Sequence, residues 1–284
     1  MENQVKIVEC SRDAMQGFPS IIPTELKVEY INSLLEVGFD TIDCGSFVSA
    51  KAVPQLADSS EVFSKINKAN NSTKLLSIIA NEKGAETACS FDNIDIIGFP
   101  FSISETFQLR NTRQTTNEAF ERLKSIQNIA ANHNKKFLVY LSMGFGNPYN
   151  DNWSVELAID WCEKIAKEGV TLINLSDTIG VASPKDINFL FEGVEGIKEV
   201  EFGAHLHTRP DNYLQNLTAA YESGCRKFDS AIKGFGGCPF AADKLTGNLP
   251  TELLLEFLES VQEPNQINKD KFSNSLILAE AVFK

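Results

Sequence analysis

The sequence contains short apolar runs that recur at regular intervals along the chain. Most of them are continuous and do not alternate between apolar and polar residues, which is typical of parallel strands buried on both faces. Eight such runs are present, so we expect eight strands. They cover residues 5–10, 39–46, 74–80, 93–102, 136–144, 171–178, 200–207 and 227–234.

Helical patterns occupy the intervals between these runs. Their apolar residues recur at positions i, i+3 and i+4, and several patterns begin at Ser or Pro and end at Gly, the residues preferred at helix starts and stops. The predicted helices cover residues 23–38, 116–134, 154–169, 183–197 and 211–224. Eight strands alternating with helices predict an α/β fold, the (β/α)8 TIM barrel, and a doubly wound open sheet is the alternative.

The alternation continues without a long linker or a change of composition. We therefore expect a single TIM-barrel catalytic domain over residues 1–284, with residues 250–284 as a C-terminal helical segment. The length agrees with this expectation, because barrels of this kind typically need about 250 residues.

Charge and cysteine usage exclude several classes of function. The formal net charge of −12 argues against nucleic acid as a partner, because no domain-wide basic surface is present to meet phosphates. No apolar stretch reaches the ~20 residues of a membrane helix, and the polar start does not resemble a signal peptide. The six cysteines are scattered without CxxC pairs, as in reduced intracellular proteins. We expect a cytoplasmic protein with a small-molecule partner, no membrane and no nucleic acid.

Two of the three histidines carry the strongest chemical signal. His205 and His207 are separated by one residue at the end of a predicted strand, where residues i and i+2 project from the same face. Two imidazoles side by side can hold a metal ion, although an isolated pair of this kind is more often two unrelated polar residues. The third histidine, His133, lies near a helix end and is expected on the surface.

Polar and ionisable residues follow every predicted strand. Active sites of TIM barrels form at the carboxyl ends of the strands, so these residues outline one site. They are Arg12, Asp13, Gln16, Asp43, Ser46, Asn81, Lys83, Ser104, Glu105, Ser142, Asp177, Thr178, His205, His207 and Asn248. Two of them also have plainer interpretations, because Asp177 fits a turn cap and Asp43 fits a partner that neutralises Arg12.

Asp13, His205 and His207, with a neutral oxygen such as that of Asn248, form a candidate ligand set for a metal. Nitrogen and oxygen ligands without a thiolate favour Mg²⁺ or Mn²⁺, while Zn²⁺ stays open. No GxSxG segment supports a Ser-His-Asp triad, and no Walker A sequence is present. The glycines of residues 234–237 suggest a hinged loop, next to which Cys238 is either a small buried residue or a reactive thiol.

These segments together resemble 3-hydroxy-3-methylglutaryl-CoA lyase, of the metal-dependent TIM-barrel lyase and synthase superfamily. The resemblance extends from Val5 to about Leu253. The motifs are VKIVECSRDAMQ (5–16), SFVSAKAVPQLAD (46–58), NEKG (81–84), SETFQLRN (104–111), LSDTIGVASP (175–184), HLH (205–207), GFGGCPFA (234–241) and TGNLPTE (246–252).

The resemblance implies a divalent-metal-dependent retro-Claisen cleavage. The substrate would be 3-hydroxy-3-methylglutaryl-CoA or a close 3-hydroxyacyl-CoA, and the products acetoacetate and acetyl-CoA. The implied ligands of Mg²⁺ or Mn²⁺ are Asp13, His205, His207 and Asn248. The resemblance further implies a homodimer and a role in leucine degradation.

Catalytic roles are implied for a second group of residues. Arg12 would stabilise the enolate of the thioester, and Cys238 would act in proton transfer. Asp43 and Asp177 would be supporting acidic groups. The hydroxyl proton of the substrate would be taken by Asp13 or His205.

Some segments depart from the family's pattern. HLHTRPDN (205–212) stands where HCHDTYG is usual, and SMGFGNPY (142–149) lacks the common cysteines. Arg209 and Lys233 add positive charge near the mouth, either to meet a carboxylate or a CoA phosphate or merely as solvated groups. Two other functions are kept open: a Claisen-type synthase or aldolase on the same barrel, and a non-catalytic binding subunit.

Overall fold

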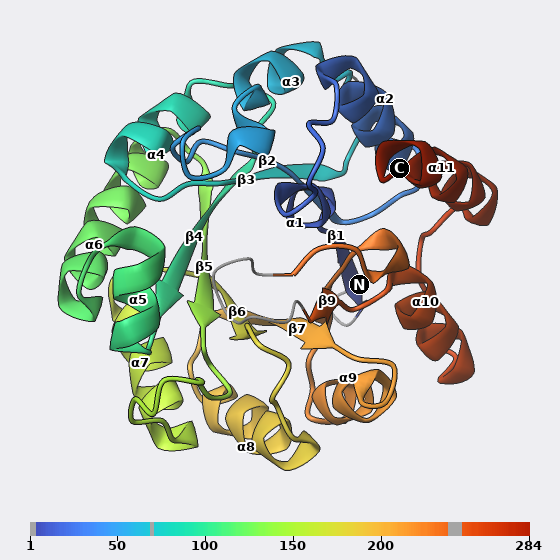
Figure 1. The fold of residues 1–284 in the computed structure, drawn as a ribbon. Helices are drawn as coiled ribbons and strands as arrows, with labels where there is room; N and C mark the ends of the chain where they lie inside the picture. The colour runs from blue at the N-terminus through green and yellow to red at the C-terminus, as the bar shows by residue number, and fades with distance from the viewer. Residues whose placement is uncertain (1–3, 69–70, 238–245) are drawn as a thin grey trace.

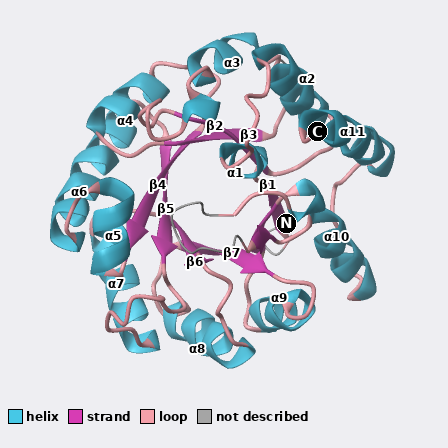
Figure 2. Cartoon of the chain, in the orientation of Figure 1, coloured by secondary structure: helices cyan, strands magenta, loops and turns pink. Residues whose placement is uncertain are grey.

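The computed structural model describes residues 4–68, 71–237 and 246–284, and these form a closed (β/α)8 barrel. Figure 1 views the ring of strands with helices around it, and Figure 2 distinguishes the inner strands from the outer helices. Neighbouring strands pair in parallel from β1 to β8, and pairing of β8 with β1 closes the ring. The strands are β1 (Lys6–Glu9), β2 (Thr41–Ser46), β3 (Lys74–Ile78), β4 (Ile96–Ser102), β5 (Lys136–Ser142), β6 (Leu172–Asp177), β7 (Glu201–Thr208) and β8 (Lys227–Ser230).

All eight predicted strands are therefore present, and the closed ring excludes the open sheet. The eighth is shorter than predicted: it ends at Ser230, and residues 232–234 form the 3-10 turn η2 (Ile232–Gly234). The reason is local backbone geometry, because Lys233 and Gly234 both adopt positive φ, at 58° and 65°. A strand cannot continue through that region of backbone space.

The predicted helices are present as well. They are α2 (Thr24–Leu35), α6 (Thr116–Asn132), α7 (Val155–Lys167), α8 (Pro184–Val194), α9 (Tyr213–Glu222), α10 (Thr251–Ser260) and α11 (Lys269–Val282). Side-chain caps explain several starts: Thr115 and Glu118 form a capping box before α6, and Ser154 and Ser183 cap α7 and α8. None of the described helices is long and apolar enough to cross a membrane.

Further short elements were not predicted from the sequence. They are α1 (Ser11–Gln16), η1 (Pro54–Leu56), α3 (Ser59–Lys65), α4 (Glu82–Cys89), α5 (Glu105–Thr112) and β9 (Gly247–Asn248). The four helices have six to eight residues, about two helical turns, and η1 and β9 are shorter still, so all six elements carry little periodic signal. Three of them, α1, α4 and α5, follow β1, β3 and β4 closely and position residues of the barrel mouth.

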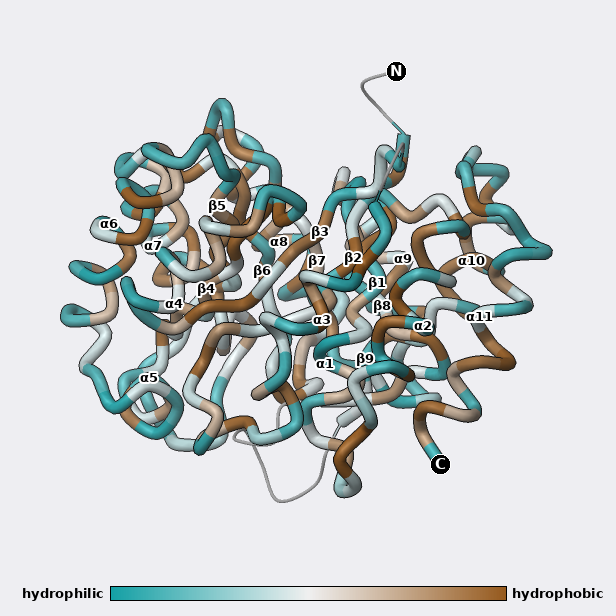
Figure 3. The backbone as a smooth tube through the Cα atoms, turned by 90° about the horizontal axis from the view of Figure 1, so that it is seen from above, coloured by the Kyte–Doolittle hydropathy of each residue, from teal (hydrophilic) through white to brown (hydrophobic). Residues whose placement is uncertain are grey.

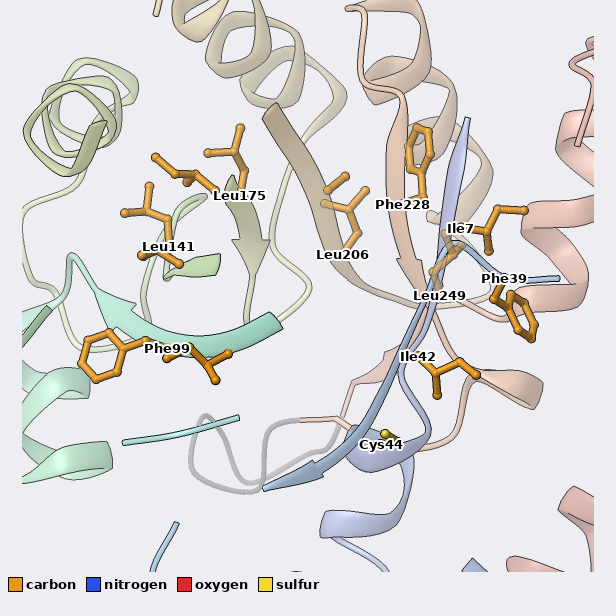
Figure 4. Close-up of a cluster of buried hydrophobic side chains, with 14 of the residues drawn as sticks. Ile7, Phe39, Ile42, Cys44, Phe99, Leu141, Leu175, Leu206, Phe228 and Leu249 are labelled. Carbon is orange, nitrogen blue, oxygen red and sulfur yellow. The ribbon is translucent and has the colours of Figure 1, made fainter. Parts of the chain in front are cut away.

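The main hydrophobic core lies between the sheet and the surrounding helices. Figure 4 shows part of this layer, in which Ile7, Phe99, Leu141, Leu206 and Phe228 come from five different strands. In Figure 3 the hydrophobic colours run along the strands, and hydrophilic positions recur along the outer helices and turns. Because residues alternate sides along a strand, the remaining positions point into the barrel.

The barrel interior has an apolar side and a polar side. A second hydrophobic cluster fills the side of β3 to β6 with Leu76, Ile78, Ile96, Leu138, Tyr140 and Leu172. Buried ionisable groups occupy the side formed by β1, β2, β7 and β8. This division places the candidate chemistry at one part of the barrel wall.

Candidate metal centre at the barrel mouth

Asp13, His205 and His207 meet at the carboxyl ends of β1 and β7. One carboxylate oxygen of Asp13 and one ring nitrogen of each histidine lie within 4.8 Å of one another. The two imidazoles project from the same face of β7, with ring centroids 5.1 Å apart, as the HxH spacing predicts. Asp13 lies in the first turn of α1, which begins directly after β1.

Asn248 reaches this group through a pairing that the sequence did not predict. The short strand β9 runs antiparallel to β7, with Asn248 opposite His207. The Asn248 amide donates to Oδ2 of Asp13 at 2.7 Å and to the backbone carbonyl of Phe235 at 2.8 Å. All four residues of the candidate ligand set are thus brought together.

The donor set fits a divalent cation. His207 is 2% exposed, yet neither of its ring nitrogens has a hydrogen-bond partner among the described residues. A buried polar atom without a partner is costly, and coordination to a metal would remove that cost. Two imidazoles and a carboxylate already point together, and the Asn248 oxygen would join them if its amide turned from the Nδ2 contact with Asp13. This set contains no thiolate, which suits Mg²⁺ or Mn²⁺.

The electrostatics of the site keep these ligands in their metal-binding forms. Burial acts to raise the pKa of Asp13, but the Arg12 guanidinium and the two histidines hold it at about 2. Burial, followed by the nearby charge of His205, lowers the pKa of His207 to about 4. At neutral pH Asp13 is therefore ionised and His207 is neutral, as coordination requires.

His205 is oriented by a residue that the sequence analysis missed. Its Nδ1 lies 3.0 Å from Oδ2 of Asp229 in β8, and the two residues are register partners. Burial acts to lower the pKa of His205, but the hydrogen bond and charge of Asp229 raise it above its ordinary value. The signal for Asp229 was slight: an acidic residue inside the apolar strand KFDS.

Arg12 is held beside the ligands by two carboxylates. Its Nε and Nη2 donate to Oδ2 of Asp43 at 2.9 and 2.6 Å, and Nη1 donates to Asp13 at 3.0 Å and to Gln16 at 2.9 Å. Burial raises the pKa of Asp43 to about 6, against the opposing effect of Arg12. Asp43 thus pairs with Arg12, and the pairing fixes the guanidinium at the mouth.

Asp177 braces the loop that follows β6. Its two carboxylate oxygens accept the backbone N–H groups of Val181 and Ala182, each at 2.9 Å. The carboxyl is 1% exposed, and burial raises its pKa to about 6 against these hydrogen bonds. The turn-cap interpretation describes these contacts, and a supporting role for Asp177 in catalysis stays a prediction.

The glycine loop passes directly over the ligands, although Cys238 itself lies outside the described residues. A Cβ at Gly236, where φ is +97°, would stand 2.7 Å from Nδ2 of Asn248 and 2.7 Å from the carbonyl oxygen of Asp13. Only glycine allows so close an approach of the backbone. The loop therefore depends on Gly236 to reach the metal ligands.

The two additional cations near the mouth already have partners. Nη1 of Arg209 donates to the carbonyl of Gly180 at 2.9 Å, and Nζ of Lys233 donates to Glu280 at 2.6 Å. Both therefore link structural elements. His133 is exposed, as expected, and lies 3.2 Å from Glu86.

The fold and these contacts define a class of protein: a (β/α)8 barrel with a carboxylate, two histidines and an arginine at its mouth. The HMGL-like family model matches residues 4–276. The chain belongs to this family.

Known members of the family are similar to this chain over most of their own length. The chain is 32% identical to a cytoplasmic 3-hydroxy-3-methylglutaryl-CoA lyase of Rattus norvegicus, over 90% of this chain and 75% of the relative. It is 31% identical to a hydroxymethylglutaryl-CoA lyase of Bacillus subtilis, over 92% and 86%. A structure of an Acinetobacter baumannii HMG-CoA lyase with coenzyme A and 3-methylmalate has a TM-score of 0.92 at 31% identity, covering 100% of this chain and 92% of that one. The carboxyl transferase domain of Rhizobium etli pyruvate carboxylase, 14% identical, shares the fold alone.

Proposed function

We propose that this protein is a carbon–carbon lyase that cleaves 3-hydroxy-3-methylglutaryl-CoA, or a close 3-hydroxyacyl-CoA, to acetoacetate and acetyl-CoA. The observation that carries the proposal is the meeting of Asp13, His205, His207 and Asn248 with Arg12 at one barrel mouth. The family resemblance implies a role in metal binding or catalysis for each of these residues, and their proximity supports those roles.

Asp13, His205, His207 and Asn248 would hold Mg²⁺ or Mn²⁺. When bound, such an ion supplies Lewis acidity and a template that orients a hydroxyl and a neighbouring carbonyl oxygen. The chain's own contribution is a buried, preorganised set of donors whose protonation states already suit coordination at neutral pH.

Arg12 is suited to stabilise the enolate oxygen that forms as the carbon–carbon bond breaks. Its guanidinium is permanently charged, 8% exposed and fixed by Asp43 on one side and Gln16 on the other. A preorganised charge in a buried site stabilises a developing anion without reorganising when the charge appears.

Asp13 and His205 are the two candidates to take the substrate's hydroxyl proton. His205 is the stronger base, because Asp229 raises its pKa, whereas the pKa of Asp13 is about 2. A ring nitrogen that holds a metal cannot also take a proton, so the ligand and base roles of His205 exclude one another at any one stage. Cys238, next to the loop glycines, would protonate the released carbon of acetyl-CoA.

The test is release of acetoacetate from 3-hydroxy-3-methylglutaryl-CoA with Mg²⁺ or Mn²⁺. We expect metal-dependent release by the wild type and almost none by His205→Ala. His133→Ala is the matched control, because His133 is exposed and lies between the end of α6 and the start of β5, at the end of the barrel opposite the mouth. Tight Mn²⁺ binding without release would mean that another acyl-CoA is the substrate.

Other functions on the same barrel predict different results. A Claisen-type synthase or an aldolase would form or exchange different products, which analysis of the reaction mixture identifies. A non-catalytic binding subunit need not bind Mn²⁺ at all. A non-catalytic subunit does not explain why Arg12, Asp13 and both histidines stand together at the barrel mouth.

Several finer features belong to the same proposal. We infer a cytoplasmic enzyme, which the free thiols of the five described cysteines support. A homodimer, which sedimentation would test, and a role in leucine degradation stay predictions from the resemblance.

A further inference from the structure

A second group of ligand atoms adjoins the candidate metal centre and shares one residue with it. The Cys10 thiol, a ring nitrogen of His205 and a carboxylate oxygen of Asp229 lie within 4.8 Å of one another. Cys10 directly follows β1, while Asp229 in β8 is the register partner of Val8 in β1 and of His205 in β7. Three adjacent strands thus converge on this point of the polar barrel wall.

The thiol of Cys10 differs from those of Cys44 and Cys225, which are also buried. Cys44 and Cys225 donate to the backbone carbonyls of Leu76 and Lys227. Cys10 is 0% exposed, and its sulfur has no backbone carbonyl contact of the kind seen at Cys44 and Cys225 among the described hydrogen bonds. Its sulfur instead adjoins an imidazole and a carboxylate, and a thiolate, an imidazole and a carboxylate are together the ligands that suit Zn²⁺ and Cd²⁺.

We propose that Cys10, His205 and Asp229 form a second metal site, selective for a soft divalent cation such as Zn²⁺ or Cd²⁺. In this site the cation would take the place of the proton on Nδ1 of His205, the nitrogen that now faces Asp229. That proton moves to Nε2, and the proton of the Cys10 thiol is released to solvent.

The two sites compete for one imidazole. A neutral imidazole has one nitrogen that carries a proton and one that can ligate. When a soft cation occupies Nδ1, Nε2 carries the proton and cannot join Asp13 and His207 around Mg²⁺ or Mn²⁺. The soft cation therefore excludes the hard one. This inference goes beyond the proposed reaction and does not depend on the identity of the acyl-CoA.

The first experiment follows the ultraviolet charge-transfer band that a thiolate–Cd²⁺ bond produces, during titration of the chelator-treated full-length protein with Cd²⁺. We expect one equivalent of Cd²⁺ to produce the band in the wild type. In Cys10→Ser the band should be lost and Cd²⁺ affinity should fall at least ~10-fold. Cys10→Ala is a second variant, in case serine perturbs the buried position, and Cys162→Ser, in the outer helix α7, should retain the band.

The second experiment measures competition by the electron paramagnetic resonance signal of free Mn²⁺. Cd²⁺ should release Mn²⁺ from the wild type, and Cys10→Ser should require at least ~10-fold more Cd²⁺ for the same release. Absence of the band in the wild type, or equal Cd²⁺ behaviour in the wild type and Cys10→Ser, would overturn the second site. Failure of Mn²⁺ to bind would instead overturn the hard-metal set of the proposed function, and the Cd²⁺ band would still decide this proposal.

Discussion

Nδ1 of His205 lies 3.0 Å from Oδ2 of Asp229, and Asp229 is itself held by the amide of Asn174, whose Nδ2 donates to both carboxylate oxygens at 2.9 Å. The three residues come from β6, β7 and β8, so the chain of contacts crosses three neighbouring strands. The imidazole is thus fixed in orientation, and Nε2 is the nitrogen available beside Asp13 and His207. A carboxylate that orients a ligating histidine in this way also raises its basicity.

Replacing Asp229 by Asn should weaken the hard-metal centre while keeping the shape of the side chain. We expect Mn²⁺ affinity to fall by ~10–100-fold, the usual cost of losing an outer partner of a metal ligand. Mn²⁺ binding followed by electron paramagnetic resonance measures this without any assay of turnover. Asp211→Asn is the control, because Asp211 is exposed and forms a surface pair with Arg209. Equal affinities in the two variants would show that Asp229 does not tune the site.

Asp43→Asn tests whether the position of Arg12 matters for the reaction. The variant removes the charge that holds the guanidinium through two hydrogen bonds to one oxygen. We expect acetoacetate release to fall by ~10²-fold, the scale measured for loss of one preorganised oxyanion donor. Mn²⁺ affinity should change much less, because Asp43 is outside the ligand set.

The Asp43→Asn protein should also be less stable, because the buried charge of Arg12 loses the carboxylate charge that neutralises it. Breaking a buried ion pair costs about 3–5 kcal/mol, although Asp13 also contacts Arg12 and reduces that loss. Chemical denaturation measures it, with Asp40→Asn, from a more exposed pair with Lys74, as control. An active, fully stable Asp43→Asn protein would contradict both expectations.

The barrel and its histidine pair were predictable from the sequence because both depend on short-range periodicity. Eight apolar runs separated by helical patterns define the strand count, and period-two geometry places His205 and His207 on one face. The sequence allowed two interpretations of Asp43, a partner that neutralises Arg12 and a supporting catalytic acid. The 2.6 Å contact between the two side chains shows the pairing.

Other parts of the site depend on long-range register, which periodicity does not contain. Asn248 meets His207 only because a two-residue strand pairs antiparallel with β7. Asp229 and Cys10 meet His205 only because β8 and β1 close the ring on that side. From the sequence, Asn248 was a candidate neutral-oxygen ligand, and the family resemblance implied the same role, but its pairing with His207 was not predicted. Asp229 and Cys10 were missed because a single polar residue in an apolar strand has no periodic signature.

Gly236→Ala should disturb the metal centre through the backbone. The added Cβ would come within 2.7 Å of Asn248 Nδ2 and of the Asp13 carbonyl oxygen, at a φ of +97° that L-residues rarely adopt. We expect both Mn²⁺ affinity and acetoacetate release to fall by at least ~10-fold. Gly196→Ala, at a glycine with open space around it, should behave like the wild type. Unchanged Mn²⁺ affinity in Gly236→Ala would mean that the loop does not set the ligand positions.

Glu9 makes stability depend on pH. It is 0% exposed and accepts hydrogen bonds from the backbone N–H of Ile232 at 2.9 Å and from the hydroxyl of Thr251 at 2.7 Å. No cation pairs with it in the described part of the chain, and burial raises its pKa from 4.5 to about 8. Between pH 4.5 and about 8, Glu9 of the folded protein keeps a proton that Glu9 of the unfolded chain has lost. The free energy of unfolding therefore falls as the pH rises through this interval.

Glu9→Gln should remove this dependence and keep an acceptor for Ile232. Relative to the wild type, the variant should gain up to ~1.4 kcal/mol in free energy of unfolding per pH unit across the interval. Urea denaturation at pH 5, 6, 7 and 8 measures the difference, and exposed Glu222→Gln should follow the wild type at each pH. If the difference in unfolding free energy between Glu9→Gln and the wild type were the same at every pH, the prediction would be wrong. Glu9 would then have the same protonation state in the folded and unfolded chains, because only a change of proton binding on folding makes the difference depend on pH.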